Sequence, residues 1–289
     1  ERSREGLDLY LEMVESGNQE GIFYYQRTIK NGARFSAYDA FLKTAIKRKN
    51  VDIKKNTLVL KIIFKGKKAV GLICEKDNKV FQIHAKKEII LCAGAIGTPH
   101  LLQVSGVGNL EYLNQIGIEP VHENKGVGEG LQDHYAVRVA NRIKLPNSLN
   151  EKASGYKLVF EIMKWFMFRR GLISYSPAHV GAFLKSSPEI DFPDLQFVFT
   201  PASYTEGMIG KLQDHPGITC GVWQSRPQSR GYVRASSNNI KNNPMIQPNY
   251  LKEKIDQDLL IQGVKMCRTL LKTSNIEKMS VSETLPGEH

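Results

Sequence analysis

The chain has 289 residues, 41% of them hydrophobic and 24% charged, a balance typical of a folded globular protein and not of a disordered or fibrous one. This length suffices for one large domain or two modest ones. No run of apolar residues is long enough to cross a bilayer.

The formal net charge of +11 makes nucleic acid or an acidic membrane surface conceivable partners. The lysines, however, form short scattered clusters at predicted turns and strand ends, where lysine keeps sheet edges soluble. No aromatic residues interleave with them as in a platform that stacks bases. We therefore expect a solvated basic surface and no nucleic-acid partner.

Four cysteines are spread along the chain without the spacing of metal ligands, and they are Cys74, Cys92, Cys220 and Cys267. Three of them stand in apolar surroundings. We predict buried free thiols, no metal site, and a reducing compartment such as the cytoplasm.

The first fifty residues predict short elements. Apolar spacing over residues 7–14 predicts an amphipathic helix, and residues 21–28 form an aromatic strand. Asn31-Gly32 predicts a tight turn, and a helix follows through Leu42.

Four strands are predicted between residues 57 and 92. They are Thr57–Phe64, Ala69–Glu75, Val80–Ala85 and Glu88–Cys92. Because the last is wholly apolar, we expect it to be buried on both faces of a sheet.

The stretch after the last strand is rich in small residues. Ala93-Gly94 follows the strand, and Thr98-Pro99 predicts a helix start, with threonine as the cap and proline at the first helical position. Ser105-Gly106 predicts its end. A strand, a small-residue crossing and a helix N-terminus let a backbone approach a flat or anionic ligand, so this stretch predicts a nucleotide site.

The composition changes from Tyr135 onward, which predicts a domain boundary. Residues Tyr156 to Arg170 predict a helix that is apolar over much of its circumference, suited to core packing, to a partner or to a membrane surface. Later strands and one long helix are predicted over residues 181–184, 193–199, 217–223, 226–233 and 256–271.

The run from Glu88 to Gly108 resembles the second signature of the glucose-methanol-choline (GMC) oxidoreductases, flavoenzymes that oxidise alcohols with FAD. Further matching patterns, PD-x-Q and RP-x-SRG-x-V, begin at Pro193 and Arg226, and the resemblance covers essentially the whole chain. It implies an α/β (mixed α+β) fold: part of an FAD-binding Rossmann-like domain over residues 1–135, and over residues 136–289 a substrate domain with an antiparallel sheet flanked by helices.

The resemblance also implies cofactor-binding residues. The backbone at Val59 would face the FAD adenine, and Ala93 and Gly94 would crowd the adenosine end. In the pattern after Gly126-Val127-Gly128, Gly130 replaces the asparagine of the family, which puts a contact from that residue in doubt.

Two parts of the family pattern do not occur in this sequence. There is no G-x-G-x-x-G turn to hold the pyrophosphate, and no HP-x-GTC-like stretch with its catalytic histidine. His289 does not match that stretch, so we assign no catalytic residue within this chain. We expect the chain to be an internal piece of a longer enzyme.

Choline dehydrogenases have the most similar segment arrangement. The resemblance implies a glutamate just before strand 181–184, where this chain has Ser176-Pro177-Ala178-His179, and if His179 takes that place the anionic partner of choline is lost. The resemblance thus implies either a choline-like or a neutral primary alcohol, with His179 in the substrate pocket, and quinone, oxygen or another electron acceptor. We expect a cytoplasmic location, with peripheral membrane contact through residues 156–170 as an option. A flavin-containing lyase of the same fold and a non-catalytic basic binding module are the alternatives.

Overall fold

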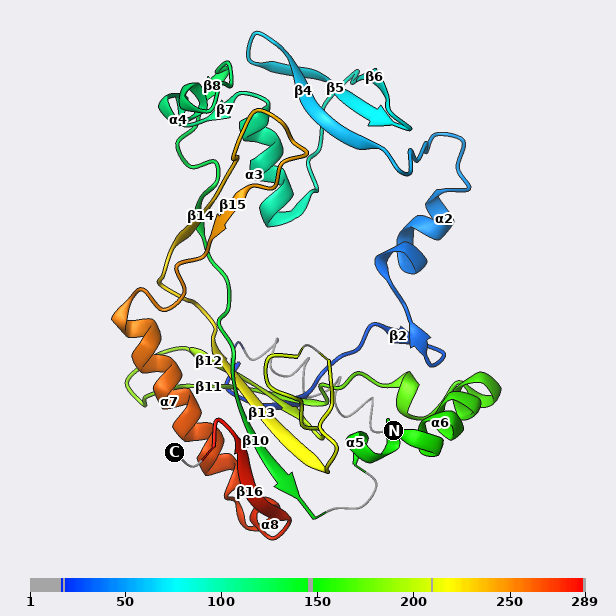
Figure 1. The fold of residues 1–289 in the computed structure, drawn as a ribbon, viewed down its shortest axis with the longest axis vertical. Coiled ribbons are helices and arrows are strands. Elements are labelled where there is room, and N and C mark those ends of the chain that lie inside the picture. The colour runs from blue at the N-terminus through cyan, green and yellow to red at the C-terminus, as the bar shows by residue number, and fades with distance from the viewer. Residues whose placement is uncertain (1–16, 18, 145–147, 209, 288–289) are drawn as a thin grey trace. The chain divides into compact units, whose positions relative to one another are not determined.

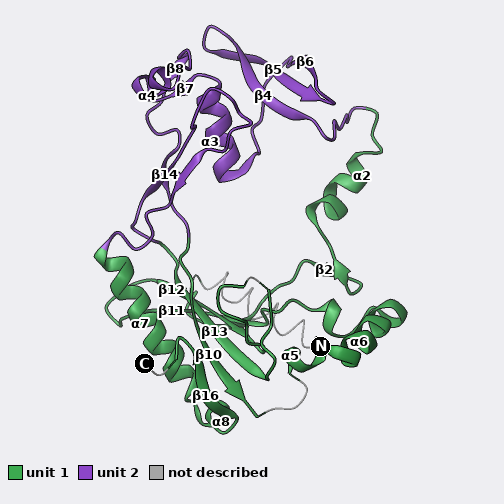
Figure 2. Cartoon of the chain, in the orientation of Figure 1, with its two compact units in different colours: residues 1–49, 134–226, 254–289 green, residues 50–133, 227–253 purple. Residues whose placement is uncertain are grey.

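The computed structural model describes residue 17 and residues 19–144, 148–208 and 210–287 (Figure 1). The helix predicted over residues 7–14 and the terminal His289 lie outside these residues. The chain forms two compact units, each assembled from separated stretches (Figure 2). Unit 1 contains residues 1–49, 134–226 and 254–289, and unit 2 contains residues 50–133 and 227–253.

The two units differ from the division at residue 135 expected from sequence. The chain does pass from unit 2 to unit 1 there, but residues 1–49 group with the later part and residues 227–253 with the earlier part. The reason is strand pairing over long sequence separations. Strand β1 (Gly21–Tyr24) pairs with β11 (Val180–Leu184), and β14 (Gly231–Arg234) pairs with β9 (Glu129–Leu131).

Unit 1 is built on a six-stranded sheet in which every neighbouring pair is antiparallel. Its strand order is β1, β11, β12 (Leu195–Thr200), β13 (Gly217–Gln224), β10 (Val137–Ile143) and β16 (Ser280–Leu285). The antiparallel sheet expected for the second domain is confirmed. Strands β10 and β16 were not predicted, although β10 lies next to the centre of the sheet.

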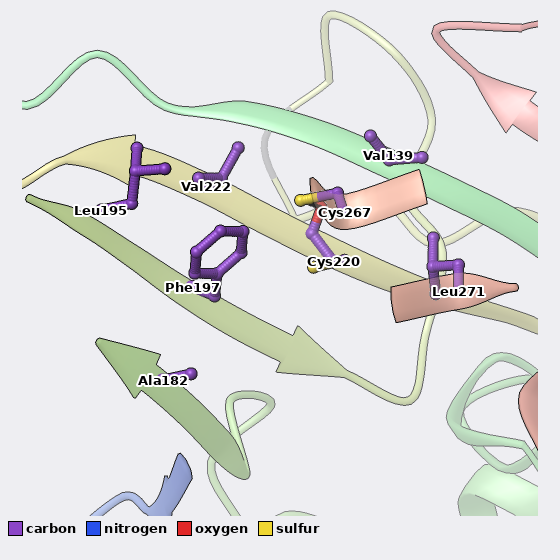
Figure 3. Packing of buried hydrophobic residues seen from close by; sticks show 8 residues of the cluster. All are labelled: Val139, Ala182, Leu195, Phe197, Cys220, Val222, Cys267 and Leu271. Atoms are coloured by element: carbon purple, nitrogen blue, oxygen red, sulfur yellow. Dashed lines mark hydrogen bonds between the residues drawn. The ribbon is translucent and has the colours of Figure 1, made fainter. Parts of the chain in front are cut away.

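Helix α7 (Lys254–Leu271) covers this sheet and closes the main core (Figure 3). Phe197 and Val222 of the sheet are fully buried, as is Cys267 of the helix. A methyl group added at Gly263 would lie 2.8 Å from Val222, so glycine lets the helix lie close to the sheet. The Cys267 thiol donates to the Cys220 carbonyl oxygen at 3.8 Å.

The cysteine prediction is confirmed for three residues. Cys74, Cys220 and Cys267 are buried free thiols, and Cys92 is an exposed one. The side-chain contact with Cys267, together with burial, raises the pKa of the Cys220 thiol, so this thiol stays protonated. The described residues contain no cluster of side chains able to hold a metal ion.

The remaining elements of unit 1 are short, except for helix α6. They are β2 (Ile29–Lys30), β3 (Ala33–Arg34), the π-helix η1 (Tyr38–Leu42), α2 (Lys43–Ala45), α5 (Leu149–Lys152), α6 (Gly155–Phe168), the 3-10 helix η2 (Leu172–Ser174) and α8 (Ser274–Glu277). Asn31 and Gly32 have φ values of 52° and 67°, which confirms the predicted tight turn between β2 and β3. Among the helices of the described residues, none is both long and apolar enough to cross a membrane.

Unit 2 combines an antiparallel meander with a helix and several short strands. Its elements are β4 (Leu58–Lys65), β5 (Lys68–Lys76), β6 (Lys79–His84), α3 (Gly94–Val104), β7 (Val107–Gly108), α4 (Leu110–Gln115), β8 (His122–Glu123), β9, β14 and β15 (Met245–Gln247). The first three predicted strands are confirmed within one or two residues at each end. Asp77 and Asn78 turn the chain between β5 and β6 with positive φ angles.

The fourth predicted strand is wrong. Residues Glu88–Cys92 form no strand, and Ile90 is 74% exposed instead of buried on both faces. A run of apolar residues is typical of a central strand, but a strand also needs neighbours that supply backbone hydrogen bonds. No strand of the described residues pairs with this stretch.

The predicted start of the following helix is also wrong. Helix α3 begins at Gly94 after the cap residue Ala93, so Thr98 does not cap it and Pro99 lies inside it. Gly94 has φ +76°, a conformation that glycine adopts at little cost, and it lets the chain turn into the helix five residues earlier than predicted. The predicted end is confirmed, because the helix stops at Val104 and Gly106 has φ +93°.

Candidate functional site

The corner at Ala93 and Gly94 is open. Both residues are exposed, and a side chain attached to Gly94 would meet no atom of the described residues within 4 Å beyond its chain neighbours and its own helix backbone. The corner stands at the N-terminus of α3, where the backbone N–H groups of the first turn have no partner within the helix. A flat or anionic group can therefore approach this backbone closely.

The other end of the same stretch is crowded. Ser105 is fully buried, and its hydroxyl oxygen accepts a hydrogen bond of 2.9 Å from the Ile62 N–H of β4. A methyl group at Gly106 would lie 2.6 Å from the Glu119 carbonyl oxygen. The Gly106 carbonyl accepts the Val121 N–H at 2.7 Å, next to the parallel pair β7–β8. Small residues at this end serve packing, whereas those at Ala93 and Gly94 leave space.

Val59 lies in β4, half-buried and paired with Cys74 of β5. Within the described sheet β5 is the only strand that pairs with β4, so the opposite edge of β4 is free of strand partners. The register shifts between Val59 and Lys61, which marks an irregularity in the strand next to this position. Val59, Ala93 and Gly94 thus belong to one unit, and the hydrogen bond from Ile62 to Ser105 joins their two elements.

Gln103 was not singled out from sequence, yet it fixes α3 in unit 2. Its side chain is buried; the amide nitrogen donates to the Val233 carbonyl and the amide oxygen accepts the Ala235 N–H, both at 2.9 Å. A methyl group at Gly128 would overlap the Val233 carbonyl and the Gln103 amide. The glycine of the Gly126-Val127-Gly128 pattern is therefore needed for this close approach, which sequence spacing alone does not reveal.

The Asp133-His134 pair lies where the chain leaves unit 2 for unit 1. The Tyr250 hydroxyl donates to the Asp133 carboxylate within unit 2. The His134 ring contacts the Ser225 carbonyl at 3.2 Å and stacks on Trp223 within unit 1. Each of the two side chains thus has a structural role within its own unit.

His179 lies just before β11 in unit 1, and its backbone accepts the Tyr25 N–H at 3.1 Å. Its Nε2 atom is buried, with no hydrogen-bond partner among the described residues. Burial and the nearby positive charge of Arg27 lower the pKa of the imidazole, so the ring is neutral at physiological pH. Its ring lies 6.0 Å from that of Tyr175.

A groove of about 470 Å³ lies beside His179. Its walls come from residues 25–29, 32–34 and 173–178, so it belongs entirely to unit 1. His179 and this groove are in one unit, while Val59, Ala93 and Gly94 are in the other.

Two sequence profiles, both described as GMC oxidoreductase, match this chain. The N-terminal profile matches residues 8–136 and the C-terminal one residues 227–288. Together they cover both stretches of unit 2 completely and part of unit 1.

Curated relatives match nearly the whole chain. The oxygen-dependent choline dehydrogenase of Staphylococcus xylosus is 32% identical over 274 residues, covering 95% of this chain and 49% of that protein. The alcohol dehydrogenase [acceptor] of Pseudomonas putida is 35% identical over 274 residues, covering 93% and 49%. The mitochondrial choline dehydrogenase of Homo sapiens is 32% identical over 272 residues, covering 94% and 46%. The chain spans about half the length of the curated relatives it matches.

Solved structures share the fold. A formate oxidase structure superposes with a TM-score of 0.85 at 20% identity, covering 93% of this chain and 51% of that one. Pyridoxine 4-oxidase from Mesorbium loti gives a TM-score of 0.80 at 22% identity, covering 95% and 50%. With both profiles and these relatives in agreement along the sequence, the chain belongs to the GMC oxidoreductase family.

Proposed function

We propose that this chain is part of an FAD-dependent oxidoreductase that acts on the CH–OH group of an alcohol. Family membership supports this function, and the open corner at Ala93 and Gly94 is the structural observation that carries it. The names of the relatives, choline dehydrogenase and alcohol dehydrogenase, point to the same reaction class. The electron acceptor is a quinone, oxygen or another oxidant.

The residues of unit 2 suit the adenosine end of FAD. The edge of β4 at Val59 offers backbone groups to an adenine, and the Ala93–Gly94 corner leaves space for close approach. The flavin ring, when bound, supplies the acceptor for the hydride that leaves the alcohol carbon. We assign binding roles to Val59, Ala93 and Gly94, and no catalytic role to any residue of this chain.

The reaction class is tested with the protein expressed from its complete reading frame. Reduction of the flavin by an alcohol removes its absorbance near the visible maximum, so we expect a primary alcohol to bleach the purified protein under anaerobic conditions. Cleavage of a cyanohydrin without bleaching would instead establish a lyase. A third outcome would establish a basic binding module: the purified protein carries no flavin, and it binds DNA or anionic lipid in a salt-dependent manner.

Gly94→Ala tests the flavin contact directly. Because the added methyl group meets no atom of the described residues within 4 Å beyond its chain neighbours and its own helix backbone, backbone strain is the main cost to the protein itself. Gly117→Ala is the matched control, since Gly117 has φ +71° and equally open surroundings. We expect the flavin dissociation constant to rise about tenfold for Gly94→Ala and to stay within about twofold for Gly117→Ala. Equal flavin content in both variants after gel filtration would contradict the contact.

His179 is our candidate residue for the substrate pocket. A quaternary ammonium is recognised by aromatic faces and by a carboxylate, which the neutral imidazole does not provide. His179→Glu is therefore expected to raise kcat/KM for choline relative to its neutral isostere 3,3-dimethylbutan-1-ol by about tenfold. Unchanged relative rates would remove His179 from the pocket.

We also propose peripheral membrane contact through residues 156–170. The inward side of α6 carries Trp165, which donates to the Gly32 carbonyl at 2.6 Å, and Glu161, which accepts the Leu172 N–H at 2.6 Å. No residue of this helix is buried. Large exposed apolar side chains occupy its other side, and they are Tyr156, Val159, Phe160, Met163, Phe166 and Met167.

The charges beside this apolar side favour an anionic lipid surface. Lys157 and Lys164 are seven residues apart, so both lie on one face of the helix, along one border of the apolar side chains. Arg169 and Arg170 lie at the C-terminal end of the helix. The one acidic residue of the helix, Glu161, has a side chain only 16% exposed. An apolar stripe bordered by cations is the pattern of a helix that lies in a membrane interface.

A double substitution, Phe160→Glu with Phe166→Glu, tests this contact by cosedimentation with phosphatidylserine vesicles. It places two carboxylates in the apolar stripe, so we expect most of the vesicle-bound fraction to be lost. Phe192→Glu is the control, because Phe192 is an exposed phenylalanine of unit 1 outside this helix. Vesicle binding that is equal in the wild type and both variants would contradict the proposal.

A further inference from the structure

The charged side chains that line the groove of unit 1 are cations. Arg27 and Arg34 line it, and its described lining includes no aspartate or glutamate. No carboxylate of the described residues forms an ion pair with Arg27. Among the described residues, the positive charge of Arg27 therefore acts on the groove without a carboxylate partner.

Arg27 also covers an aromatic ring in this groove. Its guanidinium carbon lies 5.3 Å from the centroid of the Tyr175 ring, which is a cation–π contact. The His179 ring is tilted by 55° against the same tyrosine. Because the planar guanidinium stacks well on aromatic faces, this contact holds the arginine over the tyrosine.

An aromatic face of this kind is what a quaternary ammonium ligand requires. Here a cation of the protein itself lies over that face. The adjacent His179 is neutral, since burial and Arg27 lower its pKa. A trimethylammonium group entering the groove would meet an occupied ring and a repelling guanidinium, and the described lining offers it no carboxylate.

We propose that Arg27 is a specificity-determining residue which, by lying over Tyr175, excludes quaternary ammonium substrates and selects uncharged alcohols. This inference rests on the proposed oxidation of a CH–OH group. It leaves the site of reaction unchanged and concerns only which alcohol enters the groove.

The experiment compares Arg27→Gln with a matched control in the protein expressed from its complete reading frame. Arg138→Gln is the control, because Arg138 makes the same kind of contact, 5.5 Å from the centroid of the Tyr204 ring, in the same unit but outside the groove. The measured quantity is the ratio of kcat/KM for choline to that for 3,3-dimethylbutan-1-ol. We expect Arg27→Gln to raise this ratio about tenfold and Arg138→Gln to change it less than about twofold.

Binding of tetramethylammonium gives a second readout that needs no turnover. Calorimetry should show tighter binding of this cation to Arg27→Gln than to the wild type or to Arg138→Gln. If Arg27→Gln does not fold, Arg27→Met keeps the apolar stem without the charge and should give the same result.

The failures of the two proposals are distinguishable. If an alcohol bleaches the flavin but neither the ratio nor tetramethylammonium binding changes in the Arg27 variants, the role of Arg27 is overturned and the proposed function stands. If no alcohol bleaches the flavin of any variant or of the wild type, the proposed function is overturned.

Discussion

The buried amide of Gln103 holds unit 2 together. It donates to the Val233 carbonyl and accepts the Ala235 N–H, across 130 and 132 residues of sequence. Since both polar atoms are buried, losing either partner would leave an unsatisfied group at a cost of about 1 to 3 kcal/mol. Together with the pairing of β14 with β9, these two bonds hold the segment at residues 233–235 against α3. The absence of a side chain at Gly128 permits the close approach that the two hydrogen bonds require.

Helix α3 is therefore anchored at its C-terminal half and open at its start. Gln103 and Ser105 connect that half to β14 and β4, whereas Ala93 and Gly94 face open space. This division explains why the stretch from Glu88 to Gly108 is rich in small residues. The small residues after the C-terminus of α3 allow close packing, and those at its N-terminus leave a backbone that a cofactor can approach.

Unit 1 presents two surfaces with distinct chemistry. Its antiparallel sheet and α7 form a core around Phe197 and Cys267, and the groove is lined by residues that follow β1 and residues that precede β11. The groove is cationic, and its tyrosine is covered by Arg27. Helix α6 instead turns its apolar side away from the unit and its acid inward. Both features depend on the placement of carboxylates. The described lining of the groove has none, and Glu161, the only acidic residue of α6, has a side chain just 16% exposed.

Local patterns in the sequence determined those elements whose geometry depends on neighbouring residues. Asn31-Gly32 and Asp77-Asn78 dictate their turns, the apolar runs separated by turn residues between 57 and 85 predict three strands, and the resemblance to the family signature is visible in the sequence. Tertiary structure alone decided that Glu88–Cys92 is not a strand, because pairing requires neighbouring strands that the apolar pattern cannot supply. It also decided the contacts of Gln103 and Arg27, whose partners lie 130 and 148 residues away. A sequence pattern encodes backbone preference and periodicity, whereas burial and charge environment depend on residues that only folding brings together.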